Sequence, residues 1–390
     1  MELINSTRMS AGYTIGLERS GRELLVAVVK GTFVIPGHGE PVRLADEQLP
    51  LVTADTFVGA PGLSAPLYEI DYAPTKPRCD VLLVGSAYAP HGRPVTRVEV
   101  GMRVGQIRKT FAVVGDRRWS LGRTGLAKTL ASPFTVMPIS YDRAFGGTDN
   151  RHEDPASHGA FTRNPTGRGF HKHLRSEWVD GSPLPNTEEL GRVVDTPNST
   201  AYAPMSFGPI GRGWEPRFRY AGTYDDRWLE QEFPFLPPDF DDQYYQAAPS
   251  DQQIAHPSRT EEITLSNLTP DGHVSFSLPL FDAPVHFFPK SGGREDGKLT
   301  LDTVVLEPDH QRFTLTWRSS RPLRRDIFEL AQVFVGRKGR EWWAARNAVE
   351  FPIPLTVVAG PSDQEEDDET EDDDTEATNP IGDDDLTGGE

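Results

Sequence analysis

The sequence predicts a mainly β protein with two antiparallel, sandwich-like β lobes. Apolar, β-branched stretches recur towards both ends of the chain, and several alternate apolar with polar residues, the pattern of a strand with one buried face. In addition, 36 glycines and 34 prolines divide the 390 residues into short segments. Short strands at close spacing favour an antiparallel sandwich over β-α-β units.

The N-terminal β lobe is expected to cover residues 1–137. Its clearest strand is at 96–104, where Val98, Val100, Met102 and Val104 share one face. The other stretches that we expect to form strands are 23–35, 79–89 and 107–116. All are apolar or alternating and bounded by turn-forming residues, so the lobe is predicted to be almost entirely strand.

Residues 138–257 lose this periodicity and are rich in aromatic residues, glycine and proline. We expect an irregular segment, packed between the lobes by its aromatic rings, with only short helices. One helix is expected to take Asp225 as its N-cap and to turn Trp228 and Leu229 inward.

The second β lobe is expected at 258–360, with hairpin turns at 269–272 and 307–310 between alternating stretches. The last segment, 361–390, holds 15 of the 58 acidic residues and has no lysine, arginine or aromatic residue. It cannot bury enough apolar surface to offset chain entropy, so we expect a disordered acidic tail.

One amphipathic helix is expected near the C-terminal end of the second lobe, over Arg324–Gly336. Ile327, Leu330, Ala331 and Phe334 are spaced as i, i+3, i+4 and i+7, which is typical of one helical face. The glycine that follows is a common helix stop.

Composition narrows the function classes. Residues 1–360 carry 43 acidic and 40 basic side chains and no basic stripe, which argues against a nucleic-acid surface. The single cysteine, Cys79, excludes an internal disulfide framework and opens an apolar strand, so we expect a buried thiol in a reducing compartment. The N-terminus lacks a signal-peptide pattern, and the apolar run Leu24–Val29 is too short to span a bilayer. We expect a cytoplasmic protein with no membrane association.

Motifs for catalysis, cofactors and metals are weak. The histidines at 152–158 and 171–173 lack metal-ligand spacing, and the glycine-rich stretches 122–128 and 208–213 lack the layout of phosphate loops. No Gly-x-Ser-x-Gly motif is present. We therefore expect no catalytic, cofactor-binding or metal-binding residues.

The stretch DFDDQYYQAAPSDQQ, residues 239–253, leaves an alternative open. Its aspartates, with Asp225 and Asp226 nearby and many aromatic rings, resemble the paired acids of a sugar-binding or glycoside-processing cleft. The structural interpretation is that Asp239 or Asp241 caps a short helix carrying Tyr244 and Tyr245. In that case the aspartates hold backbone groups and perform no chemistry.

Several phrases occur together in one order: KPRCDVLLVGSAYAP, VGDRRW, MPISYDRAFGG, NPTGRGF, LPNTE, FGPIGRGWEPR, AGTYDDRWLEQEFPFLPPDFDDQYYQAAPSDQQ and LDTVVLEP. In these phrases the sequence resembles the type VI secretion-associated domain-of-unknown-function 2169 family, over roughly residues 26–319. The acidic tail is not part of that resemblance.

The resemblance implies a cytoplasmic adaptor or chaperone without enzymatic activity. Its partner would be a toxin effector, bound through a PAAR or N-terminal region, or a PAAR or spike protein, and it would help to load the toxin onto the spike tip. The signature or partner-binding residues that it implies here are Tyr141, Arg143, Phe145, Gly146, Gly147, Asn164, Trp214, Arg217, Tyr224, Asp225, Trp228, Asp239, Phe240, Tyr244, Tyr245, Asp251 and Gln252.

Aromatic residues of the middle segment suit this role, because aromatic side chains are enriched at interface hot spots. More than half of them are nevertheless expected to belong to the core. The rings considered are Phe145, Phe161, Phe170, Trp214, Phe218, Tyr220, Phe233, Phe235, Tyr244 and Tyr245.

Overall fold

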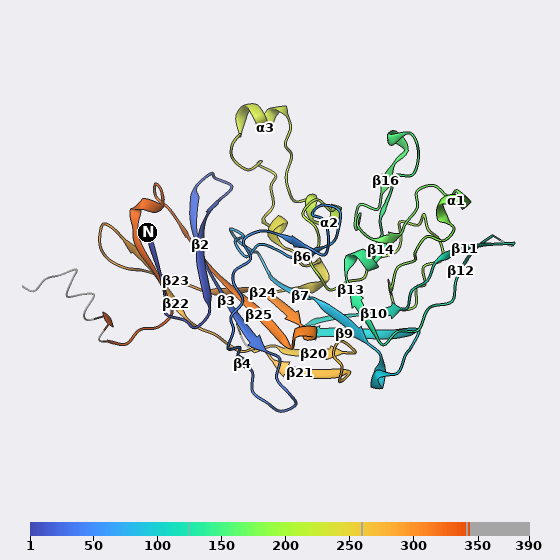
Figure 1. Cartoon of the computed structure of the whole chain (residues 1–390). Coiled ribbons are helices and arrows are strands. Elements are labelled where there is room, and N and C mark those ends of the chain that lie inside the picture. The colour runs from blue at the N-terminus through green and yellow to red at the C-terminus, as the bar shows by residue number, and fades with distance from the viewer. Residues whose placement is uncertain (124, 259, 341, 344–390) are drawn as a thin grey trace, which may run out of the picture. The chain divides into compact units, whose positions relative to one another are not determined.

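The computed structural model describes residues 1–123, 125–258, 260–340 and 342–343, and residues 1–339 form one compact unit. The prediction of a mainly β protein is confirmed, since strands dominate and the helices are short (Figure 1). The expected acidic tail at 361–390 lies outside the described residues.

The largest sheet has seven strands and draws on both ends of the chain (Figure 1). Its order is β19-β7-β24-β25-β3-β2, with β4 also paired to β3. All neighbours are antiparallel except β7 and β24, which are parallel. Cys79, the first residue of β7, is buried as expected. The strands are β2 (Ser10–Leu17), β3 (Glu23–Val34), β4 (Arg43–Leu44), β7 (Cys79–Leu83), β19 (Gln253–Ile254), β24 (Thr300–Glu307) and β25 (Arg312–Pro322).

Two smaller sheets complete the main framework. The five-stranded sheet has the order β18-β10-β9-β20-β21, and the four-stranded sheet has the order β1-β26-β22-β23. The expected hairpins are confirmed, because β20 pairs with β21 and β24 with β25. These strands are β18 (Thr187–Glu188), β10 (Ile107–Val114), β9 (Arg97–Val104), β20 (Glu262–Ser266), β21 (His273–Ser277), β1 (Glu2–Asn5), β26 (Leu330–Val335), β22 (Pro284–Pro289) and β23 (Glu295–Lys298).

One apolar core joins the three sheets. Leu25 of β3, Phe313 of β25, Met102 of β9 and Val333 of β26 all belong to the same buried cluster. The predicted alternation in β9 is confirmed, since its four apolar residues are buried while most of the residues between them are exposed. Each sheet thus contributes its apolar face to a shared interior, as in a sandwich.

The arrangement of the strands differs from the expected lobes at 1–137 and 258–360. Strand β3 pairs with β25, β7 with β24, and β9 with β20, so N-terminal and C-terminal strands lie in the same sheets. Local alternation identifies a strand but does not specify its partner, and for this reason the sequence did not reveal these long-range pairings.

The expected helix over Arg324–Gly336 is wrong. Residues Ile327–Glu329 form a 3₁₀ turn, η7, and Leu330–Val335 form β26 between β1 and β22. Strand β26 is interior to its sheet, and Phe334 and Val333 are both buried although they point to opposite faces. A strand covered on both faces has a continuous apolar run, which can imitate helical spacing.

Short elements make up the rest of the described chain. The two-stranded ladders are β5 (Thr56–Phe57) with β6 (Pro66–Tyr68), β8 (Gly85–Tyr88) with β13 (Val136–Ile139), β11 (Trp119–Gly122) with β12 (Gly125–Lys128), β14 (Phe145–Gly146) with β17 (Arg168–Gly169), and β15 (Thr148–Asp149) with β16 (Gly159–Ala160). The helices are α1 (Ser176–Val179), α2 (Glu215–Phe218) and α3 (Asp226–Gln231), and the other 3₁₀ turns are η1 (Pro90–Gly92), η2 (Tyr141–Arg143), η3 (Pro155–Ser157), η4 (Asp242–Tyr245), η5 (Ser250–Gln252) and η6 (Pro308–His310).

Candidate protein-binding surface

The loop of residues 221–240, which we call the protrusion, stands away from the sheets and carries α3 (Figure 1). Hydrogen bonds hold its two ends together. The amide of Asp241 donates to the carbonyl oxygen of Tyr220 at 3.0 Å. Thr223 donates its amide to Oδ1 of Asp239 at 2.9 Å and its hydroxyl to Oδ2 at 2.7 Å. These hydrogen bonds, from the amide first and then the hydroxyl, lower the pKa of Asp239 below its ordinary 3.8.

Gly222 allows this close approach of the two ends. Its φ of 82° lies in the left-handed region. A Cβ atom there would lie 2.9 Å from Cβ of Pro237 and 3.1 Å from the backbone nitrogen of Phe240. Only glycine meets both requirements without strain.

A tryptophan organises the interior of the protrusion. As predicted, Asp225 caps α3, with Oδ1 accepting from the amide of Trp228 at 2.9 Å. The Trp228 ring packs edge-on against Tyr224 and Phe233, with ring centroids 4.8 and 5.6 Å apart. Its Nε1 donates to the carbonyl oxygen of Phe235 at 2.9 Å. Cap, rings and indole hydrogen bond together fix α3 to the remainder of the loop.

Four apolar side chains of the protrusion are exposed to solvent. Tyr224 is 52% exposed, Leu229 60%, Phe233 63% and Phe235 45%. The expectation that Leu229 faces inward is therefore wrong, because α3 has only six residues and packs through Trp228 alone. Large apolar side chains gathered on one exposed segment are typical of a protein-binding surface.

The same segment is strongly acidic. Residues 221–240 contain five carboxylates and one arginine, a net charge of −4. Residues 1–360 as a whole are close to neutral, so this is a local concentration of charge. The protrusion therefore combines apolar contact area with a negative field, which favours a partner with basic residues around an apolar patch.

Five predicted signature residues lie in the interior of the middle segment. Nδ2 of Asn164 donates to the carbonyl oxygens of Tyr141 and Phe145, at 2.9 and 3.1 Å. The carbonyl oxygen of Asn164 accepts the amide of Gly147 at 2.9 Å. Gly146 passes so close that a Cβ atom would lie 2.1 Å from that same oxygen. These five residues hold the backbone at 164 against the backbone of 141–147. All five are buried, so they offer no surface to a partner.

Arg217 joins the middle segment to the strand β6 region. Its guanidinium is buried, donates from Nε to the carbonyl oxygen of Tyr244 at 2.6 Å, and forms an ion pair with Glu69. It also lies 5.5 Å from the centre of the Tyr244 ring. Trp214 is buried edge-on against Tyr141, with centroids 5.3 Å apart. Arg217 and Trp214, both predicted as signature or partner-binding residues, are therefore used for contacts within the protein.

Four further signature residues also make contacts inside the protein. Nη1 of Arg143 donates to Oδ1 of Asn186 at 3.2 Å. Phe240 is buried against Tyr244 and Tyr245, with centroids 5.7 and 5.4 Å apart. Burial raises the pKa of Tyr245 to about 12, so its phenol remains neutral.

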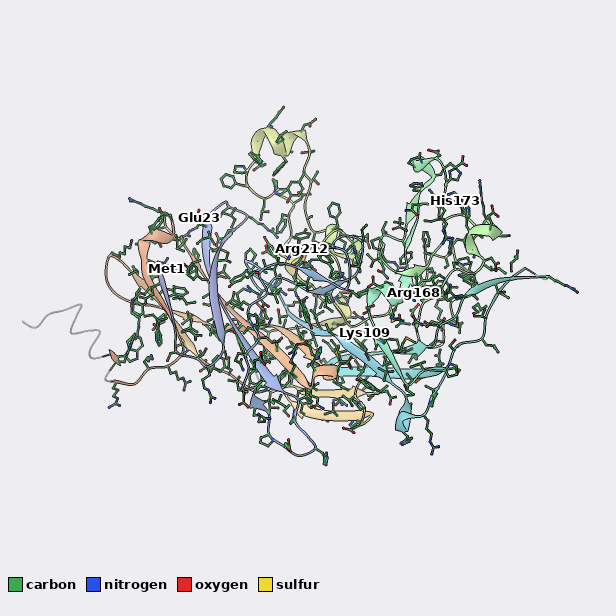
Figure 2. All side chains as sticks on the ribbon, viewed as in Figure 1. Met1, Glu23, Lys109, Arg168, His173 and Arg212 are labelled. Carbon is green, nitrogen blue, oxygen red and sulfur yellow. The ribbon has the colours of Figure 1, made fainter. Side chains whose placement is uncertain are left out.

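Gln252 connects three separate segments in the core. Its Oε1 accepts from Nζ of Lys109 at 2.7 Å, and its Nε2 donates to the carbonyl oxygens of Val81 and Phe207 at 2.7 and 2.9 Å (Figure 2, Lys109). Asp251 forms an ion pair with the same Lys109 at 3.1 Å. Burial lowers the pKa of Lys109, against the charge of Asp251.

The central aspartates serve local structure. Asp241 caps η4, accepting from the amide of Gln243 at 2.8 Å, which is the cap expected at this position. Asp225 and Asp239 fix the protrusion, and Asp251 pairs with Lys109. The contacts of Asp239 and Asp241 are those expected if the aspartates of residues 239–253 hold backbone groups.

Two histidines of the middle segment pack against each other and against a tryptophan ring. His152 and His173 lie 5.3 Å apart and both meet the edge of Trp178, at 6.1 and 6.0 Å. Within the described residues, no group of three or more histidine, cysteine, aspartate or glutamate side chains is placed to hold a metal ion. No helix in that same part of the chain is long and apolar enough to cross a membrane.

The signature list omits Leu229, Phe233 and Phe235, which form most of the exposed apolar group. Phe233 and Phe235 are among the ten aromatic residues that the sequence analysis considered for partner binding. The sequence does not tell which of those ten rings are exposed. One signal in the sequence could have indicated them. Residues 228–240 contain many apolar side chains, but the segment is short and three prolines interrupt it, so it cannot form an element that buries all of them. Of the ten rings, only Phe218, Phe233 and Phe235 are exposed.

Comparison with known proteins gives one result. Residues 20–318 match the family described as "Uncharacterized protein conserved in bacteria (DUF2169)". No curated protein and no solved structure matches the chain. The match covers the whole five-stranded sheet and all of the protrusion, and it leaves out β1, β2, β26 and the last residues of β25. The chain therefore belongs to the bacterial DUF2169 family.

Proposed function

We propose that the protein is a cytoplasmic adaptor, or chaperone, for a type VI secretion toxin. It binds the toxin through the toxin's PAAR or N-terminal region and assists its loading onto the spike tip. The observation that carries this proposal is the group of exposed apolar side chains on the protrusion, Tyr224, Leu229, Phe233 and Phe235. Such a group supplies contact area of the kind that protein interfaces use.

The frame of the protrusion supports the proposal. Asp225, Trp228 and Asp239 hold the loop by hydrogen bonds and ring packing, so the exposed side chains stand on a preformed surface. A preformed surface loses less conformational freedom on binding than a loop that must first become ordered. This suits a protein that must bind a client and later release it.

Charge indicates the chemistry of the client surface. The net charge of −4 on residues 221–240 favours an apolar patch bordered by lysine or arginine. Rim charges of this kind mainly raise the association rate, so binding is expected to weaken as salt concentration rises.

Co-purification tests the proposal. The tagged full-length protein, expressed in its own host, is expected to retain the product of an adjacent toxin or PAAR gene. A Leu229→Asp, Phe235→Asp double variant is expected to lose that product without a change in melting temperature, because both side chains are exposed and neither takes part in the ring packing around Trp228. Leu130→Asp is the matched control, since Leu130 is 94% exposed and lies outside the protrusion.

Two results would reject parts of the proposal. Retention of the client by the double variant would exclude the protrusion as the binding surface. A wild-type protein that retains neither product, in a host whose toxin delivery survives deletion of the gene, would exclude the adaptor role. Recovery of the protein in the medium together with the spike would instead indicate a spike component.

A further inference from the structure

One face of the seven-stranded sheet packs into the shared core, and the other face carries both apolar and polar residues. On β25, Phe313, Leu315 and Trp317 point into the shared core. The residues between them, including Thr314, point to the opposite face together with Lys30 of β3. Thr314 is only 3% exposed and Lys30 only 6%. A buried face that carries polar residues at the centre of a sheet requires an explanation.

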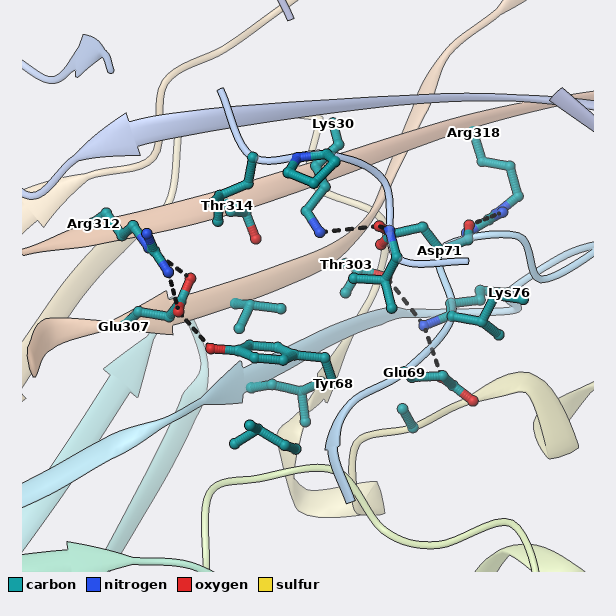
Figure 3. A pocket seen from close by; sticks show the side chains of 18 residues that line it. Lys30, Tyr68, Glu69, Asp71, Lys76, Thr303, Glu307, Arg312, Thr314 and Arg318 are labelled. Atoms are coloured by element: carbon teal, nitrogen blue, oxygen red, sulfur yellow. Dashed lines mark hydrogen bonds and ion pairs between the residues drawn. The ribbon is translucent and has the colours of Figure 1, made fainter. Parts of the chain in front are cut away.

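A hollow of about 200 Å³ lies on this second face (Figure 3). Its walls come mainly from the sheet and from the segment that includes β6. Eight of the 18 lining residues are aliphatic, and most of the surface that faces the hollow is apolar. Leu49, Val52 and Leu67 contribute from that segment, and Leu82 and Val305 from the sheet. An apolar cavity of roughly 150 Å³ is enough to hold benzene, so this hollow accommodates a molecule of about eight heavy atoms.

The charged groups around the hollow are paired with one another. Nζ of Lys30 lies 3.0 Å from Oδ2 of Asp71, and Arg312 lies 3.0 Å from Oε1 of Glu307. The hydroxyl of Tyr68 also donates to Glu307, at 2.6 Å.

The same holds deeper in the wall. Lys76 pairs with Asp80 at 2.7 Å, and Arg318 pairs with Asp302 at 2.6 Å. Glu69 faces Lys76 at 3.6 Å and forms ion pairs with two arginines. Because these charges are compensated within the protein, a charged ligand would leave a net charge buried, which is costly.

Hydrogen-bonding capacity in the hollow is incomplete. Among the described residues, the hydroxyl of Thr314 has no hydrogen-bond partner, although its side chain is buried. The ammonium group of Lys30 has three N–H groups and makes one hydrogen bond, to Asp71. Figure 3 shows the polar ends of Lys30 and Thr314 directed into the hollow. Free hydrogen-bond donors at one end and a mainly apolar surface elsewhere indicate a binding site for a molecule that has an apolar body and one hydrogen-bond acceptor.

We propose that this hollow binds an uncharged, compact apolar group carrying one carbonyl oxygen, with that oxygen accepting from Thr314 and Lys30. The aliphatic body packs between Leu67, Leu82 and Val305. An amide or ketone of about eight heavy atoms meets these requirements. The source is either a free small molecule or an apolar residue of a peptide presenting its backbone carbonyl. The site rests on the sheet geometry alone and is independent of the adaptor role.

Ligand titration of the full-length protein, followed by NMR, tests the site. The probes are 4-methylpentanamide, its isosteric carboxylate 4-methylpentanoate, and N-acetyl-leucine methylamide. The amide is expected to bind at least fivefold more tightly than the carboxylate, because the charges in the walls are already paired. Tighter binding of the capped leucine than of the small amide assigns the site to a peptide, and the reverse assigns it to a free small molecule.

Two substitutions locate the binding. Thr314→Val keeps the shape and removes the hydroxyl, so it is expected to weaken amide binding about five- to tenfold. Thr264→Val is the control, since Thr264 lies on β20 in the five-stranded sheet and does not line the hollow, and binding should change less than twofold. Preference for the carboxylate, binding of none of the probes, or equal binding by both variants would overturn the proposal.

Discussion

Thr223 and Asp239 form a two-point contact that closes the base of the protrusion. The amide and the hydroxyl of Thr223 donate to different oxygens of Asp239, at 2.9 and 2.7 Å. Both residues belong to the longest phrase of the family resemblance, residues 221–253, which also contains the exposed apolar side chains of the protrusion. The contact therefore connects a local sequence motif with the shape of the proposed binding surface.

Asp239→Ala is expected to loosen the protrusion without unfolding the protein. The substitution removes both acceptors, and the loop can then open more often. Cleavage by trypsin after Arg227, which is exposed within α3, is expected to accelerate about fivefold. Glu232→Ala is the control, because Glu232 is another carboxylate of the protrusion, lies away from the cleaved bond, and makes no side-chain hydrogen bond within the described residues. Equal cleavage rates in Asp239→Ala and the native protein would contradict this role of the contact.

Acidification is expected to have the same effect through protonation of Asp239. Its pKa in the folded protein lies below 3.8, so the contact contributes stability above that pH, and the contribution is lost as pH falls further. Hydrogen exchange at the Thr223 amide should therefore stay slow down to about pH 4 and lose protection below it. In Asp239→Asn this step should be absent. A step of equal size in that variant would assign the pH dependence to another group.

Gln252→Met is expected to destabilise the fold by about 3 kcal/mol, because it leaves two buried carbonyl oxygens and the buried ammonium of Lys109 without their partner. Gln253→Met is the matched control. The side chain of Gln253 is only partly buried and donates one hydrogen bond, to Ala248, so a loss below about 1 kcal/mol is expected. Urea denaturation of both variants measures the difference, and similar losses would show that Gln252 has no special structural role.

Local features were predictable because local chemistry determines them. The alternation in β9, the cap at Asp225 and the turn at 307–310 depend on residues close in sequence, and all three were predicted. Pairing between β3 and β25 depends on contacts across nearly three hundred residues, about which a local pattern says nothing. For β26, burial on both faces removed the alternation that identifies a strand.

The surface was less predictable than the fold. Seventeen residues were expected as signature or partner-binding positions, and many are buried, such as Asn164, Arg217 and Gln252. A resemblance identifies residues that a fold needs as readily as residues that a partner needs. The exposed Leu229 and Phe233 could be recognised only once α3 was seen to pack through a single tryptophan. The hollow near Thr314 likewise depends on which segment covers the sheet, which no local pattern in β25 specifies.

Gly146→Ala is expected to be among the most damaging single substitutions in the chain. The φ of Gly146 is 152°, a conformation that costs other residues about 1–3 kcal/mol, and the new Cβ would lie 2.1 Å from the carbonyl oxygen of Asn164. That oxygen belongs to the backbone and is held by the amide of Gly147, so it cannot move aside cheaply. We expect a loss above about 3 kcal/mol, or failure to accumulate as folded protein. Gly213→Ala provides the comparison, since a Cβ there meets nothing within 4 Å and φ is not in the left-handed region. Its melting temperature should match that of the native protein. A Gly146→Ala variant that melts within a few degrees of Gly213→Ala would show that the crossing of 146 and 164 tolerates a side chain.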